Sequence, residues 1–597
     1  MLRQVLLPTI LVFLGYGFWI SPDFKEISAG VAIFLFGMLA LEEGFKAFSG
    51  GMLEKILKKS TDKLYKSIGF GMFATTFMQS SSLVSVLTIS FLGAGLISLS
   101  QGIGIVFGAN IGTTTGAWLV AGFGLKVKIS AYAMPMLVFG VILIFQKSKT
   151  SKGLGYILAG LGFLFLGIHY MKDGFEAFKS SIDLASFSVD GLKGLFIFTG
   201  IGIFATVVMQ SSHATLVLII TALSVGQITY ENALALAIGA NVGTTITAII
   251  GSMSSNIEGK RLAGAHLIFN VVTGLIAIIF MSQIMVAVDF SSAFFGIADD
   301  DYTLKLAVFH TIFNLIGVIV MIPFIGKLVI FLEKYLKDSG SKQNGVNIDS
   351  TKYLNNSVLE LPTTAIAAIR KETKHLYENA FEIIAHGINV KRGNIVSSMD
   401  LDEVIKEKFN NKAINIDDFY TRKIKGIYGD IIDFSTKAQS KMNQEYVEEL
   451  YKIKLANRDI VEAVKNTKHL QKNLVKYSES INPHIKAEYN LIRRDITELL
   501  RNINIVSTTD EKDVIVLLLS KAKIIAEKQD IMANGKLDNL IRNSLISNEM
   551  ATSLMNDSAY TYGISKNLIA MAEVLFLNIE GITINEDEVE QFLAVNK

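Results

Sequence analysis

The chain of 597 residues contains no cysteine, which excludes disulfides, thiol catalysis and cysteine-type zinc or iron–sulfur sites and leaves the redox compartment undetermined. The net charge is only +2, and no basic stretch alternates with aromatic residues, so nothing indicates a nucleic-acid partner. The sequence also lacks a Walker-type nucleotide loop. Energy for any active process must therefore come from an ion gradient.

Charge is missing over long stretches of the first half. Residues 68–125 contain no Asp, Glu, Lys or Arg, and Glu231 is the only such residue between Lys193 and Glu258. Because a membrane-spanning helix needs roughly 20 apolar residues, each stretch has room for more than one span. The apolar run over residues 5–20 ends without a small-residue cleavage site, so we expect a first membrane helix and not a secretory signal.

The apolar half contains an internal repeat. The motif Gln-Ser-Ser-Ser at 79–82 aligns with Gln-Ser-Ser-His at 210–213, and Gly-Ala-Asn-Ile-Gly-Thr-Thr at 108–114 aligns with Gly-Ala-Asn-Val-Gly-Thr-Thr at 239–245. Both motifs are offset by 131 residues (210 − 79 and 241 − 110), so no gap separates them. Paired, polar-interrupted hydrophobic segments are typical of secondary transporters, although channels and membrane enzymes are also duplicated.

The serine motif is costly inside an apolar run, because each polar side chain must find a partner where water does not compete. One copy alone is best interpreted as packing between helices. Two copies in register with a second polar motif favour a function. If the helix breaks at the serines, the backbone N–H groups and hydroxyls that begin its second half form an anion site.

The second motif has complementary chemistry. Its glycines allow the backbone to unwind, and its amide and hydroxyl oxygens suit a small hard cation, for which sodium is the natural candidate. For Gly108 and Gly239, close helix packing explains the residue as well as binding does. The oxygens expected to bind sodium belong to Asn110, Thr113, Thr114, Asn241, Thr244 and Thr245.

Neither motif contains an arginine or lysine, which a mid-membrane oxyanion would normally need. Bound cations and helix N-termini would have to neutralise the oxyanion, and this predicts coupling of transport to sodium.

The doubled Gln-Ser-Ser motif followed by Gly-Ala-Asn-x-Gly-Thr-Thr resembles the type II sodium/phosphate cotransporter family, in particular its bacterial members with a PhoU-like C-terminal domain. The resemblance covers roughly residues 27–336 and implies an all-α fold with two inverted repeats, each with a re-entrant helical hairpin that carries the serine motif at its tip. It implies a phosphate site, with sodium as coupling ion and no other cofactor, lined by Gln79, Ser80, Ser81, Ser82, Gln210, Ser211 and Ser212. It also implies support from the Asn and Thr residues of the second motif.

The second serine motif departs from the first, because His213 stands where the first copy has Ser82. A histidine there would titrate near neutral pH and make transport pH-dependent, although a neutral histidine bonded to a neighbouring helix is at least as good an interpretation. Two further histidines, His266 and His310, each precede an Asn by four residues. Their spacing is not that of a metal site, so we expect satisfied interface histidines without a functional role.

The composition changes at residues 337–350, where polar and charged residues replace the apolar run, and we expect a linker there. Leu361-Pro362 resembles a helix start. Residues 351–597 are predicted to form a soluble, PhoU-like helical domain, and one helical face is formed by Ile492, Ile496, Leu499, Leu500 and Ile503. The PhoU family binds metal through acidic clusters, but the stretch around Asp557 is not such a cluster, so we expect no metal.

We expect a membrane domain over residues 1–336, with repeats at about 30–150 and 160–290 and a final span at 304–332. An acidic loop at 299–301 lies opposite a basic group, which places the soluble domain in the cytoplasm and the protein in the inner membrane. The basic group consists of Lys55, Lys58, Lys59, Lys63 and Lys66.

The leading hypothesis is a multi-pass secondary transporter that moves inorganic phosphate with sodium across the lipid bilayer by alternating access. The alternative is a membrane phosphate sensor that signals through its tail. An enzyme is third, because the apolar core has no acid–base constellation and no catalytic residue is expected. The sequence leaves open the direction, the stoichiometry, the acceptance of arsenate, homo-oligomerisation and a regulatory protein bound to the tail.

Overall fold

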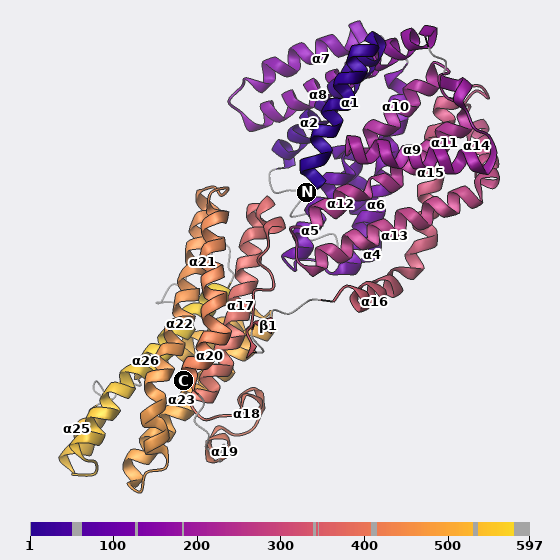
Figure 1. Cartoon of the computed structure of the whole chain (residues 1–597). Helices are drawn as coiled ribbons and strands as arrows, with labels where there is room; N and C mark the ends of the chain where they lie inside the picture. The colour runs from indigo at the N-terminus through magenta and orange to yellow at the C-terminus, as the bar shows by residue number, and fades with distance from the viewer. Residues whose placement is uncertain are drawn as a thin grey trace. The chain divides into compact units, whose positions relative to one another are not determined.

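The computed structural model describes residues 2–49, 63–125, 129–181, 184–337, 342–343, 346–407, 415–528 and 535–577. The chain forms two compact units (Figure 1). The first, called the membrane unit below, comprises Met1–Asp338 and Asn355–Glu360; the second, called the soluble unit, comprises Ser339–Leu354 and Leu361–Lys597. Three lysines of the predicted basic group, Lys55, Lys58 and Lys59, lie outside the described residues, as do residues 338–341 and 344–345 of the predicted linker.

The membrane unit is helical throughout its described residues. Its α-helices are α1 (Leu2–Ile20), α2 (Pro22–Ser49), α4 (Leu64–Met78), α5 (Ser81–Gly93), α6 (Leu99–Trp118), α7 (Ile129–Ile144), α8 (Lys149–Ser181), α9 (Gly191–Met209), α10 (Ser212–Ser224), α11 (Tyr230–Gly243), α12 (Thr245–Ser252), α13 (Ile257–Ile279), α14 (Met281–Phe294), α15 (Tyr302–Met321) and α16 (Ile325–Tyr335). Shorter turns are η1 (Leu119–Gly124), η2 (Leu184–Phe187), η3 (Ile322–Phe324) and η4 (Asn356–Glu360).

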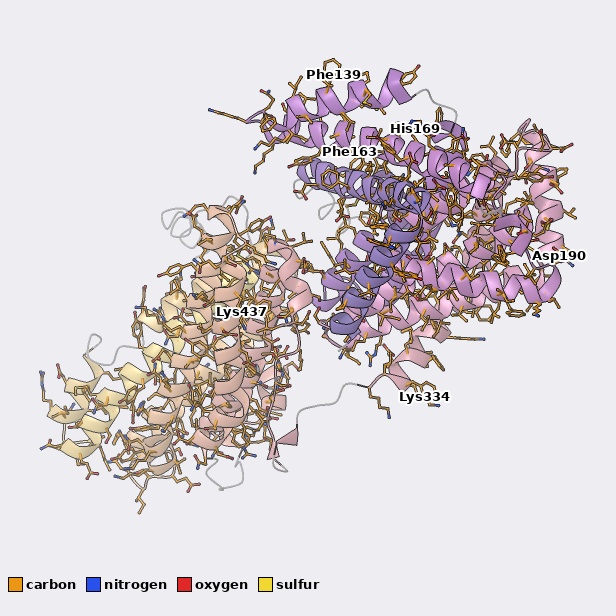
Figure 2. All side chains as sticks on the ribbon, turned by 45° about the horizontal axis from the view of Figure 1, so that its top comes forward. Phe139, Phe163, His169, Asp190, Lys334 and Lys437 are labelled. Atoms are coloured by element: carbon orange, nitrogen blue, oxygen red, sulfur yellow. The ribbon has the colours of Figure 1, made fainter. Side chains whose placement is uncertain are left out.

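Seven stretches of the described residues are long and apolar enough to cross a membrane: Pro22–Phe45, Leu99–Gly124, Lys149–Lys179, Gly191–Met209, Tyr230–Ser252, Ile257–Ile279 and Tyr302–Tyr335. The outer surface of this unit also carries apolar side chains, such as Phe139 on α7, which is 61% exposed and points outward in Figure 2. An exposed apolar surface of this kind is suited to lipid. The predicted last span is a helix with a short 3-10 turn at η3, where Pro323 lacks the backbone donor that a regular helix needs.

Helices α2 and α8 pack along a seam of glycines spaced seven residues apart. A methyl group on Gly37 would lie 2.8 Å from the carbonyl oxygen of Gly160, and one on Gly30 would lie 2.8 Å from that of Gly167. Gly44 faces Gly153 in the same way. Since the residue number rises on one helix as it falls on the other, the helices run antiparallel, and only residues without side chains permit this close approach.

The glycines of the Gly-Ala-Asn motifs serve the same purpose. A methyl group on Gly108 in α6 would overlap the carbonyl oxygen of Ile68 in α4, and one on Gly239 in α11 would overlap that of Thr199 in α9. The first motif is helical throughout, because α6 continues to Trp118, whereas α11 ends at Gly243 in the second motif and Thr244 separates it from α12. Of the two explanations left open by the sequence, packing accounts for these glycines.

The soluble unit is a bundle of long helices. Its α-helices are α17 (Pro362–Gly387), α18 (Arg392–Val396), α19 (Leu401–Lys406), α20 (Ile416–Tyr420), α21 (Gly426–Gln439), α22 (Gln444–Ser478), α23 (Pro483–Thr508), α24 (Lys512–Lys528), α25 (Lys536–Arg542) and α26 (Asn548–Phe576). It also contains the π turn η5 (Thr421–Lys425) and two short antiparallel strands, β1 (Lys342–Gln343) and β2 (Val346–Asn347).

Two sequence predictions for this unit are confirmed. Helix α17 begins at Pro362, and all five apolar residues of the predicted face on α23 are buried. Asp557 on α26 is 1% exposed and accepts a 2.5 Å hydrogen bond from the hydroxyl of Tyr489 on α23. Its carboxylate is therefore part of the bundle core.

Candidate functional site

The two serine motifs interrupt two pairs of helices at equivalent points. Gln79 between α4 and α5 has φ 51°, and Gln210 between α9 and α10 has φ 53°, so both residues adopt the left-handed conformation. This conformation costs a residue with a side chain about 1 kcal/mol. The following serine caps the next helix in each case: Ser80 accepts from the amide of Leu83 at 3.2 Å, and Ser211 accepts from that of Ala214 at 3.1 Å.

The chain folds back on itself at the second break. The Thr206 hydroxyl in the last turn of α9 donates to the Thr215 hydroxyl in the first turn of α10 at 3.0 Å. Residues nine apart in one continuous helix would lie about 13 Å apart along its axis. The break is thus the tip of a helical hairpin, and the free N–H groups that begin α10 lie at this tip.

The tips differ in one matched pair of positions. At the first tip, the Ser82 and Thr247 hydroxyls lie 3.2 Å apart. At the offset of 131 residues, Ser82 is equivalent to His213 and Thr247 is equivalent to Gly116. The His213 ring occupies the space that a side chain at Gly116 would fill, since a methyl group there would overlap the ring. The larger imidazole is thus accommodated by the loss of a side chain opposite it.

The His213 ring has two further contacts. It packs against Phe34 on α2 with ring centroids 5.7 Å apart, and it hydrogen-bonds the backbone of Gln79 at the other tip. The second hairpin therefore contacts the first through His213, the position at which the two serine motifs differ.

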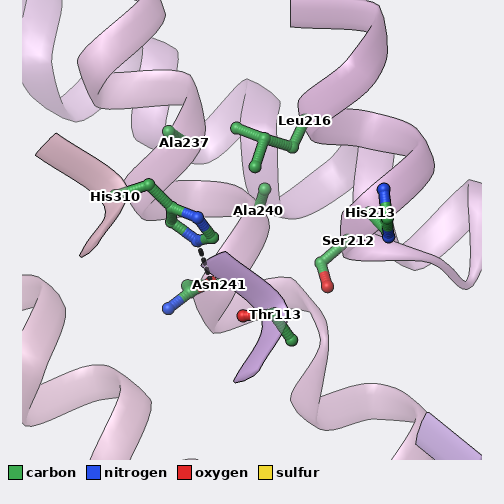
Figure 3. A pocket seen from close by; sticks show the side chains of 8 residues that line it. All are labelled: Thr113, Ser212, His213, Leu216, Ala237, Ala240, Asn241 and His310. Atoms are coloured by element: carbon green, nitrogen blue, oxygen red, sulfur yellow. Dashed lines mark hydrogen bonds between the residues drawn. The ribbon is translucent and has the colours of Figure 1, made fainter. Parts of the chain in front are cut away.

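A small cavity lies beside the second tip (Figure 3). Its volume is about 10 Å³, close to the minimum for one water molecule, and none of its lining residues carries a formal charge when the histidines are neutral. It is lined by Thr113, Ser212, His213, Leu216, Ala237, Ala240, Asn241 and His310. The first repeat thus contributes Thr113 to a cavity that the second repeat and α15 otherwise enclose.

A hydrogen-bonded network holds Asn241 at the cavity wall. The nitrogen Nε2 of His310 lies 3.2 Å from Oδ1 of Asn241, and Nδ2 of Asn241 donates to Oδ1 of Asn314 at 2.7 Å. Nδ2 of Asn314 in turn donates to the carbonyl oxygen of His310 at 2.8 Å. All three residues are buried, so the network fixes the orientation of the Asn241 amide.

The predicted phosphate ligands are divided by the structure. Ser212 lines the cavity, and its hydroxyl donates to Thr244 at 3.2 Å. Gln79 donates to Thr115 at 3.2 Å, whereas Gln210 is exposed. Six of the seven predicted residues lie at the two tips without lining the cavity: Gln79, Ser80, Ser81, Ser82, Gln210 and Ser211.

The predicted sodium ligands are also divided. Thr113 and Asn241 line the cavity. Asn110 and Thr114 bond their own helix α6, because Nδ2 of Asn110 donates to Val106 O at 2.9 Å and the Thr114 hydroxyl donates to Ile111 O at 2.8 Å. The Thr245 hydroxyl, at the start of α12, donates to Val242 O in α11 at 2.8 Å. Sodium binding by these residues stays a prediction.

His310 was not among the predicted site residues. The sequence signal was present, because His266 and His310 each precede a Phe and an Asn in the same spacing, but we predicted satisfied interface histidines. That prediction is wrong in one respect: Nδ1 of each ring is buried and has no hydrogen-bond partner among the described residues. Only His310 lines the cavity, and its position there depends on how α15 packs against α11, which the spacing alone does not specify.

Residues 33–173 and 186–299 match the family described as Na+/Pi-cotransporter. The membrane unit belongs to that family. The residues matched to the Na+/Pi-cotransporter family include both hairpin tips and both Gly-Ala-Asn motifs, whereas His310 and Asn314 lie beyond them. Together with the seven apolar helices, membership identifies a multi-pass membrane protein.

The chain is 26% identical over 377 residues to the "Putative inorganic phosphate export protein YjbB" of Escherichia coli (strain K12). The match covers 61% of this chain and 64% of that protein. A protein of the same name from Salmonella typhimurium (strain LT2) is 25% identical over 372 residues with the same coverage. The chain thus spans less than two thirds of the length of these relatives. The "Uncharacterized protein YqeW" of Bacillus subtilis (strain 168) is 25% identical over 301 residues, which cover 50% of this chain and 93% of that protein. No solved structure matches the chain.

Proposed function

We propose that this protein is a secondary active transporter that moves inorganic phosphate across the inner membrane together with sodium. The observation that carries the proposal is the hairpin tip beside a cavity lined by hydroxyls, an amide and imidazoles without a formal cation. An oxyanion at such a site meets helix N–H groups and hydroxyls, but its charge requires a partner. Co-bound sodium supplies that partner, which makes anion binding depend on the cation.

The two repeats are proposed to be inverted with respect to each other. Equivalent helices of the repeats, α2 and α8, pair antiparallel. The sequence Gly-Phe-Lys-Ala-Phe at 44–48 in α2 aligns with Gly-Phe-Glu-Ala-Phe at 174–178 in α8 at an offset of 130 residues, and at this offset Gly30 and Gly37 are equivalent to Gly160 and Gly167. The contact of Gly30 with Gly167 is then the image of the contact of Gly37 with Gly160. A two-fold axis perpendicular to the helices relates these contacts, and such an axis supports inverted topology.

The size of the cavity supports alternating access. About 10 Å³ is too small for a tetrahedral oxyanion, so phosphate enters only when the repeats rearrange. The name of the YjbB relatives favours export as the direction of phosphate movement. The same proposal places the soluble unit in the cytoplasm as a PhoU-like domain. It also holds that the protein transports phosphate without catalysing a reaction.

Uptake into proteoliposomes tests the proposal. Radiolabelled phosphate uptake by the intact protein is measured with and without an inward sodium gradient, and compared with a Ser81→Ala, Ser212→Ala double variant. The matched control is Ser224→Ala, which removes a hydroxyl at the far end of the same helix α10, where it donates to Thr221 O. Sodium-dependent uptake that only the double variant loses supports transport at the tips. Equal, sodium-independent leak in all three proteins contradicts it.

A second candidate function, a membrane phosphate sensor, is favoured by the packing of η4. Within the membrane unit, Val358 is fully buried, and the Ser90 hydroxyl of α5 donates to Ser357 O at 2.6 Å. The chain that leads into the soluble unit is thereby fastened to the second arm of the first hairpin. A sensor predicts little flux but phosphate-dependent protection of the soluble unit from protease, whereas a transporter predicts flux in the same proteoliposomes.

A further inference from the structure

Residues 349–354 are the part of the soluble unit that directly precedes η4, and they are called the connector below. One carboxylate of α17 holds the backbone of the connector. Oε2 of Glu372 accepts from the amide of Lys352 at 2.9 Å and from that of Tyr353 at 2.8 Å. Glu372 is fully buried, so loss of either bond would leave a buried acceptor with one partner fewer.

His375, on the same helix, lies between two carboxylates. Its Nδ1 is 2.7 Å from Oε1 of Glu372, and its Nε2 is 3.2 Å from Oδ2 of Asp349 in the connector. An ionised carboxylate can only accept, and a neutral imidazole carries a single N–H. Satisfying both carboxylates therefore requires a second proton, which the imidazolium form of His375 supplies.

Asp349 is ionised near neutral pH. Burial disfavours its charge, but the hydrogen bond from Asn379 and the positive charges of His375 and Lys352 hold the pKa of this carboxyl below its ordinary value of 3.8. Nδ2 of Asn379 donates to Oδ2 of Asp349 at 2.8 Å and to Lys423 O at 3.0 Å. The carboxylate of the connector is therefore fixed against α17 and faces the ring as an acceptor.

The other charged groups around the cluster do not replace the proton on His375. Two further acids, the exposed Glu378 on α17 and Asp430 on α21, add negative charge near Tyr353 and Glu372. Basic side chains on α17 and η5 have other partners: Arg370 pairs with Glu449, Lys371 lies over the ring of Tyr353, Lys374 lies over that of Phe576, Arg422 pairs with Asp418, and Lys423 pairs with Glu382. A change of charge on His375 therefore acts on both carboxylates at once.

We propose that protonated His375 holds the connector on α17 and that loss of this proton releases the connector. In the neutral ring, one nitrogen presents a lone pair to a carboxylate oxygen, so two acceptors face each other without a proton. Attachment is therefore stabilised at lower pH, and this stabilisation is lost as the pH rises and the ring becomes neutral. Release adds residues 349–354 to the free chain before η4, about 20 Å when extended. This inference goes beyond the proposed function and does not depend on phosphate transport.

Hydrogen exchange of the full chain in detergent tests this inference, because the amides of Lys352 and Tyr353 report on their bonds to Glu372. Exchange is measured by mass spectrometry at about pH 6 and about pH 8.5, with exchange times scaled for the intrinsic pH dependence of amide exchange. We expect protection of the connector to fall at least about tenfold at the higher pH. The start of α22, where Tyr446 N donates to the neutral Oδ1 of Asn443, is the internal control and should keep its protection. Equal protection of the connector at both pH values would overturn the inference.

Two variants should remove the pH dependence in opposite ways. His375→Gln has no proton to lose and cannot donate to both carboxylates, so the connector should exchange fast at both pH values. Glu372→Gln keeps an amide oxygen for the connector and offers an N–H to Nδ1, so a neutral ring satisfies both neighbours and protection should persist at both. His484→Gln, which alters an exposed histidine on α23, is the control and should behave like the unaltered protein. Full pH dependence in His375→Gln or in Glu372→Gln would overturn the inference; if neither folds, the connector and the start of α22 in the unaltered protein decide.

Discussion

The two hairpin tips satisfy the same backbone geometry with different side chains. At the first tip a serine faces a threonine, and at the second His213 faces the bare backbone of Gly116. The left-handed glutamine and the serine cap are the same at both. Both tips have the same backbone conformation, and side chains fill the space between the facing positions in both. The chemical groups that fill this space differ. This difference places an imidazole between the repeats, next to the cavity that Asn241 and His310 close.

The largest effect is expected from Gly116→Thr, which copies the first tip into the second while His213 is still present. The new side chain overlaps the ring, and overpacking of this kind costs about 1–3 kcal/mol. Because the displaced tip lies beside the cavity, we expect uptake to fall at least about tenfold. Adding His213→Ser should restore uptake, since it recreates the pair seen at the first tip. Gly122→Ala, which meets nothing within 4 Å, is the control. A double variant no better than the single one would contradict the volume exchange.

The second comparison is between the equivalent helices α2 and α8. Gly37→Ala places a methyl group 2.7 Å from the backbone nitrogen of Leu164, so the helices must separate, and we expect a loss of about 1–3 kcal/mol in stability. Thermal unfolding in detergent, followed by size-exclusion chromatography, measures the effect. Gly200→Ala on α9, which has open space around it, should unfold like the unaltered protein. Equal melting of the two variants would show that the seam tolerates a side chain.

His213→Ser alone makes the second tip resemble the first without filling the space beside Gly116. Uptake is expected to decrease a few-fold, because the contact with Phe34 is lost and a void remains. If His213 titrates during transport, the variant also has a flatter dependence of uptake on pH between about pH 5.5 and 8.5. An unaltered pH profile with reduced uptake would assign His213 to packing alone.

The smallest effect concerns a buried polar group of the soluble unit. Burial raises the pKa of Asp557 above its ordinary value of 3.8, against the hydrogen bonds from Tyr489 and Asn473 that lower it. The ionised carboxylate is therefore unfavourable in the folded state, and this cost appears as the pH rises above 3.8. Asp557→Asn removes the charge and keeps an acceptor for Tyr489, so we expect a gain of up to about 1 kcal/mol at pH 7.

Thermal unfolding of the full chain at pH 7 and pH 4 measures this effect, and the gain should shrink at the lower pH. A gain of 1 kcal/mol corresponds to roughly 2–4 °C for a domain of this size. Glu549→Gln, which alters an exposed carboxylate on the same helix α26, is the control. Destabilisation of Asp557→Asn at pH 7 would mean that the bond from Tyr489 requires the charge.

Much of the architecture could be predicted from the sequence, because it depends on local or periodic patterns of residues. Uncharged apolar runs predicted the membrane unit, the constant offset placed the two serine motifs beside the breaks at Gln79 and Gln210, and Pro362 predicted the start of α17. These features follow from burial of apolar surface and from backbone preferences, both of which act over a few residues.

The residues that line the cavity could not be predicted from the sequence in this way. The sequence placed all seven tip residues together, yet Ser212 lines the cavity with Thr113 and Asn241, and Gln210 is exposed. The sequence left packing and binding open for Gly108, whereas the structure places the carbonyl of Ile68 against it. Such contacts join residues far apart in the chain, and their register is determined by packing in three dimensions.

The apolar segments, the serine motifs and the repetition of the two halves could be predicted from the sequence, since each of these depends on neighbouring residues or on a constant offset. The fit of His213 against Gly116 and the place of His310 in the cavity wall depend on the tertiary structure. The physical reason is that hydrogen-bond satisfaction and steric fit depend on distances of a few ångströms between helices, which no periodicity within one helix specifies.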